Sequence, residues 1–283
     1  MGSIIKNRYL ILRRITQISI LFLYFSANYY GWKILAGNLS FSKLFDTIPL
    51  ADPFAVLQMA FAGAVISTDL IIGVLIILFF YGLIGGRAYC SWVCPVNMIT
   101  DLAAWIRRKT HHEKDNLISA QKIKNFRYFF LVIMLVVSTL VGAAAFEFIS
   151  PIGIFTRGIA FTLGFGWVWL LVIFLFDTFV LKNGWCGHIC PVGAMYSIIG
   201  SKSIVRVYHE KDNCTNCGEC LIVCPENQVL SPVIHKKSDY ISGIECTNCG
   251  RCIEVCNDNA LKFTLRYLIK QKKGENHEKT ANS

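Results

Sequence analysis

The sequence predicts an α-helical integral membrane protein with a small α+β domain at its C-terminal end. Three observations lead to this prediction. Hydrophobic residues make up 54% of the 283-residue chain and charged residues only 16%, whereas soluble proteins contain about 25% charged residues. Four long apolar stretches precede residue 181. Eight of the twelve cysteines then follow in a polar region that begins near Ser201.

Each of the four apolar stretches is long enough to cross a bilayer, which takes about 17–25 mostly apolar residues. The predicted spans are residues 15–36, 70–86, 128–146 and 158–180. A fifth uncharged segment, residues 53–68, is short for a span. We interpret it either as a re-entrant or interfacial segment or as an early start of the second helix.

Basic residues predict the orientation of the helices, because the cytoplasmic loops of membrane proteins are rich in Lys and Arg. The first 14 residues contain four basic residues and no acidic one, and the loop 87–125 contains seven basic residues. We therefore expect both termini and this loop on the cytoplasmic side of the membrane. The net charge of +10 is then explained without nucleic-acid binding.

The composition along the chain predicts three regions. Residues 1–200 form a four-helix transmembrane domain, residues 201–268 a ferredoxin-like domain, and residues 269–283 a polar, disordered tail. The first domain contains an internal repeat, because residues 86–96 resemble residues 184–193. We interpret this domain as two similar helical hairpins, each of which ends in Cys-x-x-x-Cys-Pro.

Eight cysteines form two runs with the spacing Cys-x-x-Cys-x-x-Cys-x-x-x-Cys, which is the spacing of bacterial ferredoxins. In such a run the first three cysteines bind one [4Fe–4S] cluster and the fourth binds the other cluster. The two runs therefore predict two clusters with crossed ligand sets. Cluster one is assigned to Cys214, Cys217, Cys220 and Cys256. Cluster two is assigned to Cys246, Cys249, Cys252 and Cys224.

Other residues in these runs fit the same interpretation. Gly218 and Gly250 allow the backbone to approach a cluster, where its amides can hydrogen-bond to sulfur. The second run has Asn257 where the first has Pro225, which removes no ligand. Zinc sites and disulfides are the alternatives, but zinc prefers separate Cys-x-x-Cys pairs and disulfides are rare in the cytoplasm.

The remaining four cysteines form the pairs Cys90/Cys94 and Cys186/Cys190. In a helix this spacing puts both members on one face, and the proline that follows ends or kinks the helix. The pairs are candidates for a redox pair, for cofactor-binding ligands of a further centre, or for a docking face; the alternative is that they pack as small apolar residues. His188, inside the second pair, is either a further ligand or, as we expect, a solvated loop residue.

Asp177 lies in the inner part of the fourth predicted span. An ionisable residue at membrane depth is a candidate functional residue. We expect Asp177 either to act catalytically, by accepting a proton when a quinol is oxidised, or to pair with a nearby basic residue. The sequence contains no motif for nucleotide, nicotinamide or flavin binding and no Cys-x-x-Cys-His for haem attachment.

The four helices, the paired Cys-Pro motifs and the two ferredoxin runs together resemble the NapH family. Residues 224–230, Cys-Pro-Glu-Asn-Gln-Val-Leu, are similar to the Cys-Pro-Glu-Pro-Gln-Val-Leu stretch of that family, with Asn227 as the departure. NapH proteins are ferredoxin-type membrane subunits of the quinol dehydrogenase of periplasmic nitrate reductase. The resemblance implies oxidation of quinol, with electrons passed to a periplasmic multi-cluster ferredoxin-type partner.

Three functions remain open on the sequence. The first is the electron-transfer subunit just described. The second is a membrane iron–sulfur maturation or redox-sensing factor for a periplasmic reductase or amine dehydrogenase, since similar cores occur in methylamine dehydrogenase and nitrous oxide reductase systems. The third is a membrane anchor whose clusters only hold the fold. For the first function, electrons must cross about 30 Å of hydrocarbon to reach a periplasmic acceptor.

Overall fold

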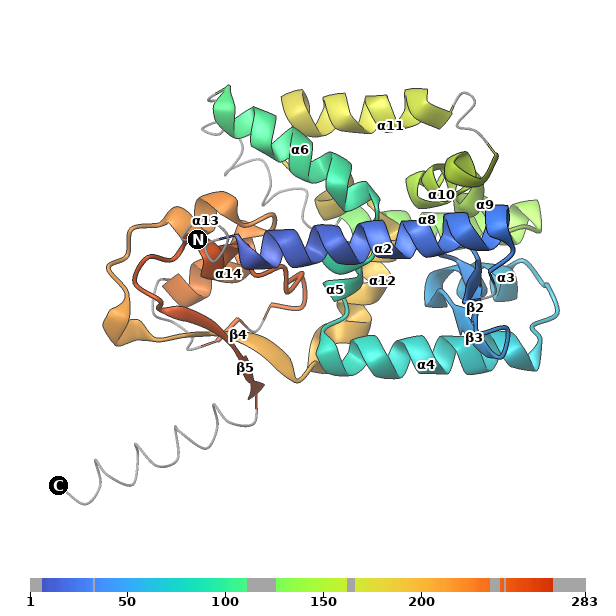
Figure 1. Cartoon of the computed structure of the whole chain (residues 1–283), viewed down its shortest axis with the longest axis horizontal. Helices are drawn as coiled ribbons and strands as arrows, with labels where there is room; N and C mark the ends of the chain where they lie inside the picture. Colours follow the sequence, from blue (N-terminus) through green and yellow to red (C-terminus); the bar gives the residue numbers. More distant parts are fainter. Residues whose placement is uncertain are drawn as a thin grey trace, which may run out of the picture.

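The structure is a computed structural model that describes residues 7–32, 34–110, 126–161, 166–234, 240–241 and 243–266. Long helices run side by side along the molecule, as Figure 1 shows. The cysteine-rich domain lies at one end of these helices and a small β-sheet lies near the other. The predicted tail 269–283 lies outside the described residues, as does the second part of the predicted basic loop.

Helix α2, Arg8–Tyr30, begins seven residues before the predicted first span and ends six residues earlier than predicted. Arg13 and Gln17, both buried, explain the earlier start. Gln17 Nε2 donates hydrogen bonds of 3.1 Å to the carbonyl groups of Ser91 and Cys94. The basic end of α2 is therefore part of the packed interior, and the predicted bounds are wrong.

A three-stranded antiparallel sheet follows α2, and the sequence analysis did not predict it. Its strands, in spatial order, are β1 (Leu35–Gly37), β2 (Phe41–Leu44) and β3 (Ile48–Ala51). Asp52 is the N-cap of helix α3, Pro53–Phe61, because its side chain accepts a hydrogen bond from the amide of Ala55. Because α3 ends before α4 begins at Thr68, segment 53–68 is not an early start of the second helix.

Among the described residues, α2 alone is long and apolar enough to cross a membrane by itself. Three further apolar helical segments have 10–17 residues: α4 (Thr68–Ile84), α8 (Phe126–Val141) and α11 continued by the π-helix η1 (Gly166–Leu175 and Phe176–Val180). They correspond to the second, third and fourth predicted spans.

The fourth predicted span, residues 158–180, is not one helix. Its first part belongs to α10, Pro151–Phe161, which follows the short helix α9, Ala145–Ile149. Its second part is α11 with η1. Helix α11 packs back against α10 rather than continuing it, and the indole N–H of Trp169 in α11 donates a 3.1 Å hydrogen bond to the carbonyl of Ile149.

The two Cys-Pro segments have matching structures. Helix α5, Ala88–Trp92, is followed by Pro95 and by α6, Val96–Lys109. In the second copy the π-helix η2, Trp185–Ile189, is followed by Pro191 at the start of α12, Pro191–Ile199. The prediction that each proline ends a helical segment is confirmed.

The cysteine-rich domain begins after the short 3₁₀ helix η3, Gly200–Lys202. Two antiparallel strands, paired through Val207 and Phe263, join its ends, and short helices lie between them. Its elements are β4 (Val205–His209), η4 (Lys211–Asn213), α13 (Glu219–Val223), α14 (Asn227–Ile234), α15 (Arg251–Val255) and β5 (Leu261–Leu265). This α+β arrangement agrees with the predicted ferredoxin-like domain.

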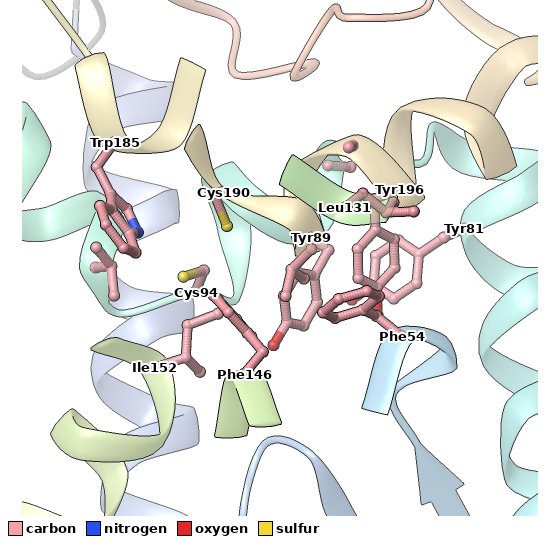
Figure 2. Close-up of a cluster of buried hydrophobic side chains, with 14 of the residues drawn as sticks. Phe54, Tyr81, Tyr89, Cys94, Leu131, Phe146, Ile152, Trp185, Cys190 and Tyr196 are labelled. Carbon is pink, nitrogen blue, oxygen red and sulfur yellow. The ribbon is translucent and has the colours of Figure 1, made fainter. Parts of the chain in front are cut away.

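The core of the helical part lies where the two Cys-Pro segments meet (Figure 2). The rings of Tyr89 and Tyr196, one from each half, stack with centroids 4.5 Å apart, and Tyr81 meets both rings edge-on. Figure 2 shows the sulfur atoms of Cys94 and Cys190 pointing into the same space beside these rings. The internal repeat therefore builds one shared core rather than two.

Candidate iron–sulfur centre

The two cysteine runs fold in the same way, as their shared sequence Cys-Thr-Asn-Cys-Gly suggests. The asparagine and the glycine have positive φ angles in both runs: 58° and 80° at Asn216 and Gly218, and 48° and 76° at Asn248 and Gly250. Glycine adopts such angles without strain and asparagine tolerates them. These turns let the backbone wrap closely, and each glycine caps the short helix that carries the third cysteine.

The structure brings the eight cysteines together in two sets that ring two separate small cavities. The outer cysteine set consists of Cys214, Cys217, Cys220 and Cys256. The inner cysteine set consists of Cys224, Cys246, Cys249 and Cys252. These are the ligand sets expected from the spacing, with the fourth cysteine of each run exchanged.

The residues present in both sets suit iron–sulfur clusters. Among the described residues, no group of three or more His, Cys, Asp or Glu side chains is arranged to hold a metal ion. The sulfurs instead surround a cavity, which is the arrangement that a four-iron cubane requires. Burial raises the pKa of the Cys220 and Cys246 thiols to about 11, so cluster binding must displace their protons.

The two sets differ in their surroundings. Cys217 of the outer cysteine set is exposed, whereas Cys249 and Cys252 of the inner cysteine set are buried. The loop 246–250, which carries Cys246 and Cys249 of the inner cysteine set, lies directly on α5. It also contacts the end of α4, where Asn248 Nδ2 donates a 3.0 Å hydrogen bond to the Ile84 carbonyl. Ser91 Oγ donates a 2.7 Å hydrogen bond to the Thr247 carbonyl, and the Trp92 indole donates one of 3.0 Å to the Asn248 carbonyl.

A buried charge network joins the inner cysteine set to the helices. Arg87 Nη1 donates to Glu226 Oε1 at 2.5 Å, and Arg127 Nη1 lies 3.1 Å from the same oxygen. Arg127 Nη2 lies 2.6 Å from Glu245 Oε1. Glu226 closely follows Cys224, a member of the inner set. Burial opposes ionisation of Glu226, but Arg87 and Arg127 outweigh that effect and lower its pKa below the usual value.

The sequence analysis missed this network. Glu226 and Glu245 lie within two residues of inner-set cysteines, which is a signal that could have pointed to them. Their partners come from distant helices: Arg87 lies 139 residues from Glu226 in the chain. Single-sequence patterns do not pair residues at such separation.

The four cysteines of the Cys-Pro segments form a third group, here called the cysteine chamber: Cys90, Cys94, Cys186 and Cys190. Cys94 and Cys190 belong to the buried core shared by the two halves of the repeat, and Cys90 and Cys186 pack against that core. Arg87 borders the chamber, because its Nη2 donates a 2.9 Å hydrogen bond to the Cys186 carbonyl. The same guanidinium group thus contacts both the chamber and Glu226.

Asp177 and His188 lie beside the chamber. Asp177 is 1% exposed, and its Oδ1 accepts a 3.0 Å hydrogen bond from the amide of Trp185 at the start of η2. The carboxylate therefore holds the turn that leads into Cys186. His188 is buried within η2, so its interpretation as a solvated loop residue is wrong.

Comparison with known families agrees with both parts of this arrangement. The family described as "4Fe-4S binding domain" matches twice, at residues 66–111 and 159–206, which confirms the internal repeat. The family described as "4Fe-4S dicluster domain" matches residues 206–257, which contain both cysteine runs. The fold and these matches define a ferredoxin-type iron–sulfur protein, a class that carries electrons.

Comparison with individual proteins identifies the family. Ferredoxin-type protein NapH of Haemophilus influenzae is 44% identical over 237 residues, covering 82% of this chain and 80% of the relative. NapH of Escherichia coli is 43% identical over 235 residues, with the same coverage. The methylamine utilization ferredoxin-type protein MauN of Methylorubrum extorquens is 40% identical over 234 residues, again 82% of this chain and 80% of the relative. The chain belongs to the NapH family of ferredoxin-type proteins. No solved structure matches it.

Proposed function

We propose that this protein is the membrane electron-transfer subunit of a quinol dehydrogenase in the bacterial inner membrane. It takes electrons from quinol and passes them to a multi-cluster ferredoxin-type partner of a periplasmic nitrate reductase system. The observation that carries the proposal is the position of the inner cysteine set, which is fixed by hydrogen bonds onto α5 of the apolar helical part.

Two [4Fe–4S] clusters are part of the proposal. When bound, each cluster exchanges one electron at a time, so together they can take the two electrons that one quinol releases with its two protons. The surroundings of each cysteine set determine with which molecules its cluster would exchange electrons. The exposure of Cys217 favours the outer cysteine set as the side that faces other molecules. The charge network of Arg87 and Arg127 holds the inner cysteine set against the helices.

The proposal also places four apolar segments across the membrane: α2, α4, α8 and α11 with η1. Figure 1 shows them running along the molecule, with the cysteine-rich domain at the end where the basic N-terminus begins. By the charge rule this end is cytoplasmic. The three shorter segments are apolar helices of 10–17 residues, and a short hydrophobic stretch is accommodated by local thinning of the bilayer.

The cysteine chamber is proposed to be redox-active or to bind a cofactor. Cys94 and Cys190 are buried, with exposures of 6% and 8%, and Cys90 and Cys186 pack against them. This burial argues against a docking face for a partner protein. The cysteine chamber lies between the inner cysteine set and the apolar helices. A group that carries electrons from the inner set toward the far side of the membrane would have to lie in this region.

Electron paramagnetic resonance of the purified full-length protein, titrated anaerobically with a menaquinol or ubiquinol analogue, tests the proposal. We expect quinol to produce the signals of reduced clusters, and the partner to reoxidise them. Clusters that stay oxidised with excess quinol and partner present would refute quinol oxidation. If this protein were a maturation factor, deletion of its gene would leave quinol oxidation in the cell intact.

A further inference from the structure

A cavity of about 750 Å³ lies where α2, α6, α10, α13 and α15 meet. Its volume falls within the range of roughly 300–1,000 Å³ that is typical of small-molecule sites. The junction lies between the basic end of α2 and the cysteine-rich domain (Figure 1). Its size and place make it the strongest candidate for a ligand site outside the cysteine sets.

One wall of this cavity is apolar. Leu102 and Trp105 of α6 line it, and each is 52% exposed. Helix α2, which also lines the cavity, has further exposed apolar residues nearer its middle: Ile15, Ile18 and Phe22 are 54–56% exposed. A ligand with a flat ring and a long hydrocarbon tail fits this wall, because the ring would occupy the cavity and the tail would follow α2 into the lipid.

The opposite wall is polar. Asp101 of α6 is contacted by Arg14 and Arg251, and Arg13 Nη1 lies 3.4 Å from its Oδ2. Four arginines, including Arg108, line the cavity with two carboxylates, Asp101 and Glu254, so its polar wall has a net positive charge. Glu254 accepts a hydrogen bond from the amide of Leu10. The guanidinium groups of this wall can donate hydrogen bonds to the oxygen substituents of a ring.

The same cavity adjoins the inner cysteine set. Arg251 lines both this cavity and the cavity that the inner cysteine set surrounds. Arg251 precedes Cys252 in the chain, and Val223, also in the lining, precedes Cys224. A ring held in the cavity therefore lies next to the chain segments that carry the inner-set ligands.

We propose that this cavity, the α2–α6 pocket, binds the quinol ring, with its polar oxygens toward Asp101 and Arg251 and its tail along α2. The inference rests on the proposed function and gives it a binding site. Asp177, the residue that the sequence analysis expected to accept a proton, does not line the pocket. The pocket is instead formed by α2, α6, α10 and the ends of the two short helices that carry Cys220 and Cys252.

Photoaffinity labelling of the full-length protein with an azido-quinone, in nanodiscs of phosphatidylcholine, tests the pocket directly. Ile99→Trp and Leu102→Trp fill the pocket from α6. Ile72→Trp, on the exposed face of α4, is the matched control because Ile72 is 45% exposed and does not line the pocket. We expect the label on α6 or α15 peptides, with at least a tenfold loss of labelling in both pocket variants and none in the control.

The same variants separate this inference from the proposed function. Label on other peptides, or label retained by both pocket variants, would overturn the pocket as the quinone site. So would labelling that is abolished when anionic phosphatidylglycerol is added, which would assign the pocket to a lipid headgroup. If quinol reduces the clusters of the wild type and of both pocket variants equally, the pocket inference fails and the proposed function stands. If the azido-quinone labels the pocket but quinol reduces no cluster, the proposed function fails and the binding site stands.

Discussion

Replacing Glu226 by glutamine is expected to loosen the junction between the cysteine-rich domain and the helices. The variant keeps the size of the side chain but leaves Arg87, which is 2% exposed, without a carboxylate, while Arg127 keeps Glu245. Removing one partner of a buried ion pair costs about 3–5 kcal/mol. We expect the lower end, about 3 kcal/mol, because Arg87 still donates to the carbonyl groups of Glu245 and Cys186.

At roughly 2–4 °C per kcal/mol for a chain of this size, the unfolding midpoint should fall by about 6–12 °C. Circular dichroism follows the helices and visible absorbance follows the clusters, both on purified protein in detergent. Glu219→Gln is the control, because Glu219 is exposed and lies next to a cysteine of the outer set. A Glu226→Gln midpoint within 2 °C of the wild type would refute the view that this network holds the domain in place.

Three further predictions concern separate parts of the molecule. Cys220→Ser should remove about half of the iron and leave one cluster signal in electron paramagnetic resonance, since it takes a ligand from the outer cysteine set alone; complete loss of iron would contradict separate sets. Cys190→Ser should keep the iron of the ferredoxin domain but slow electron transfer to an acceptor at least tenfold in stopped-flow measurements, and an unchanged rate would exclude a redox role for the chamber. Burial raises the pKa of Asp52 to about 7. Because an unfolded Asp ionises near pH 4, the unfolded chain loses this proton first, and the contribution of Asp52 to stability falls as the pH rises from about 4 to 7. Asp52→Asn keeps a good helix N-cap and should reduce this loss in melting curves recorded across that range; an unchanged slope would show that other groups cause it.

The sequence predicted the cysteine sets well because their geometry is local. Spacing within each run and glycine at one fixed position determine how the chain wraps, and Gly218 and Gly250 both adopt the expected turn. The exchange of Cys224 and Cys256 followed from the same spacing. The doubling of the Cys-Pro motif was likewise visible as a repeated string of residues.

What the sequence did not predict depends on contacts between distant segments. The start of α2 was placed too late because an arginine next to an apolar stretch is expected at the membrane surface. Arg13 is instead buried beside Asp101, 88 residues away in the chain. The fourth span was drawn as one helix because hydropathy does not show that α11 packs back against α10. His188 was placed in solvent, whereas the folded chain buries it, because a single sequence does not show which segments pack over a residue.

The exchange of the fourth cysteine between the two sets has a consequence for synthesis of the protein. The outer cysteine set lacks Cys256, and the inner set lacks its last three members, until almost the whole domain has left the ribosome. The helical part that the loop 246–250 rests on is made first. Iron and sulfide can therefore complete either set only after most of the domain has been translated.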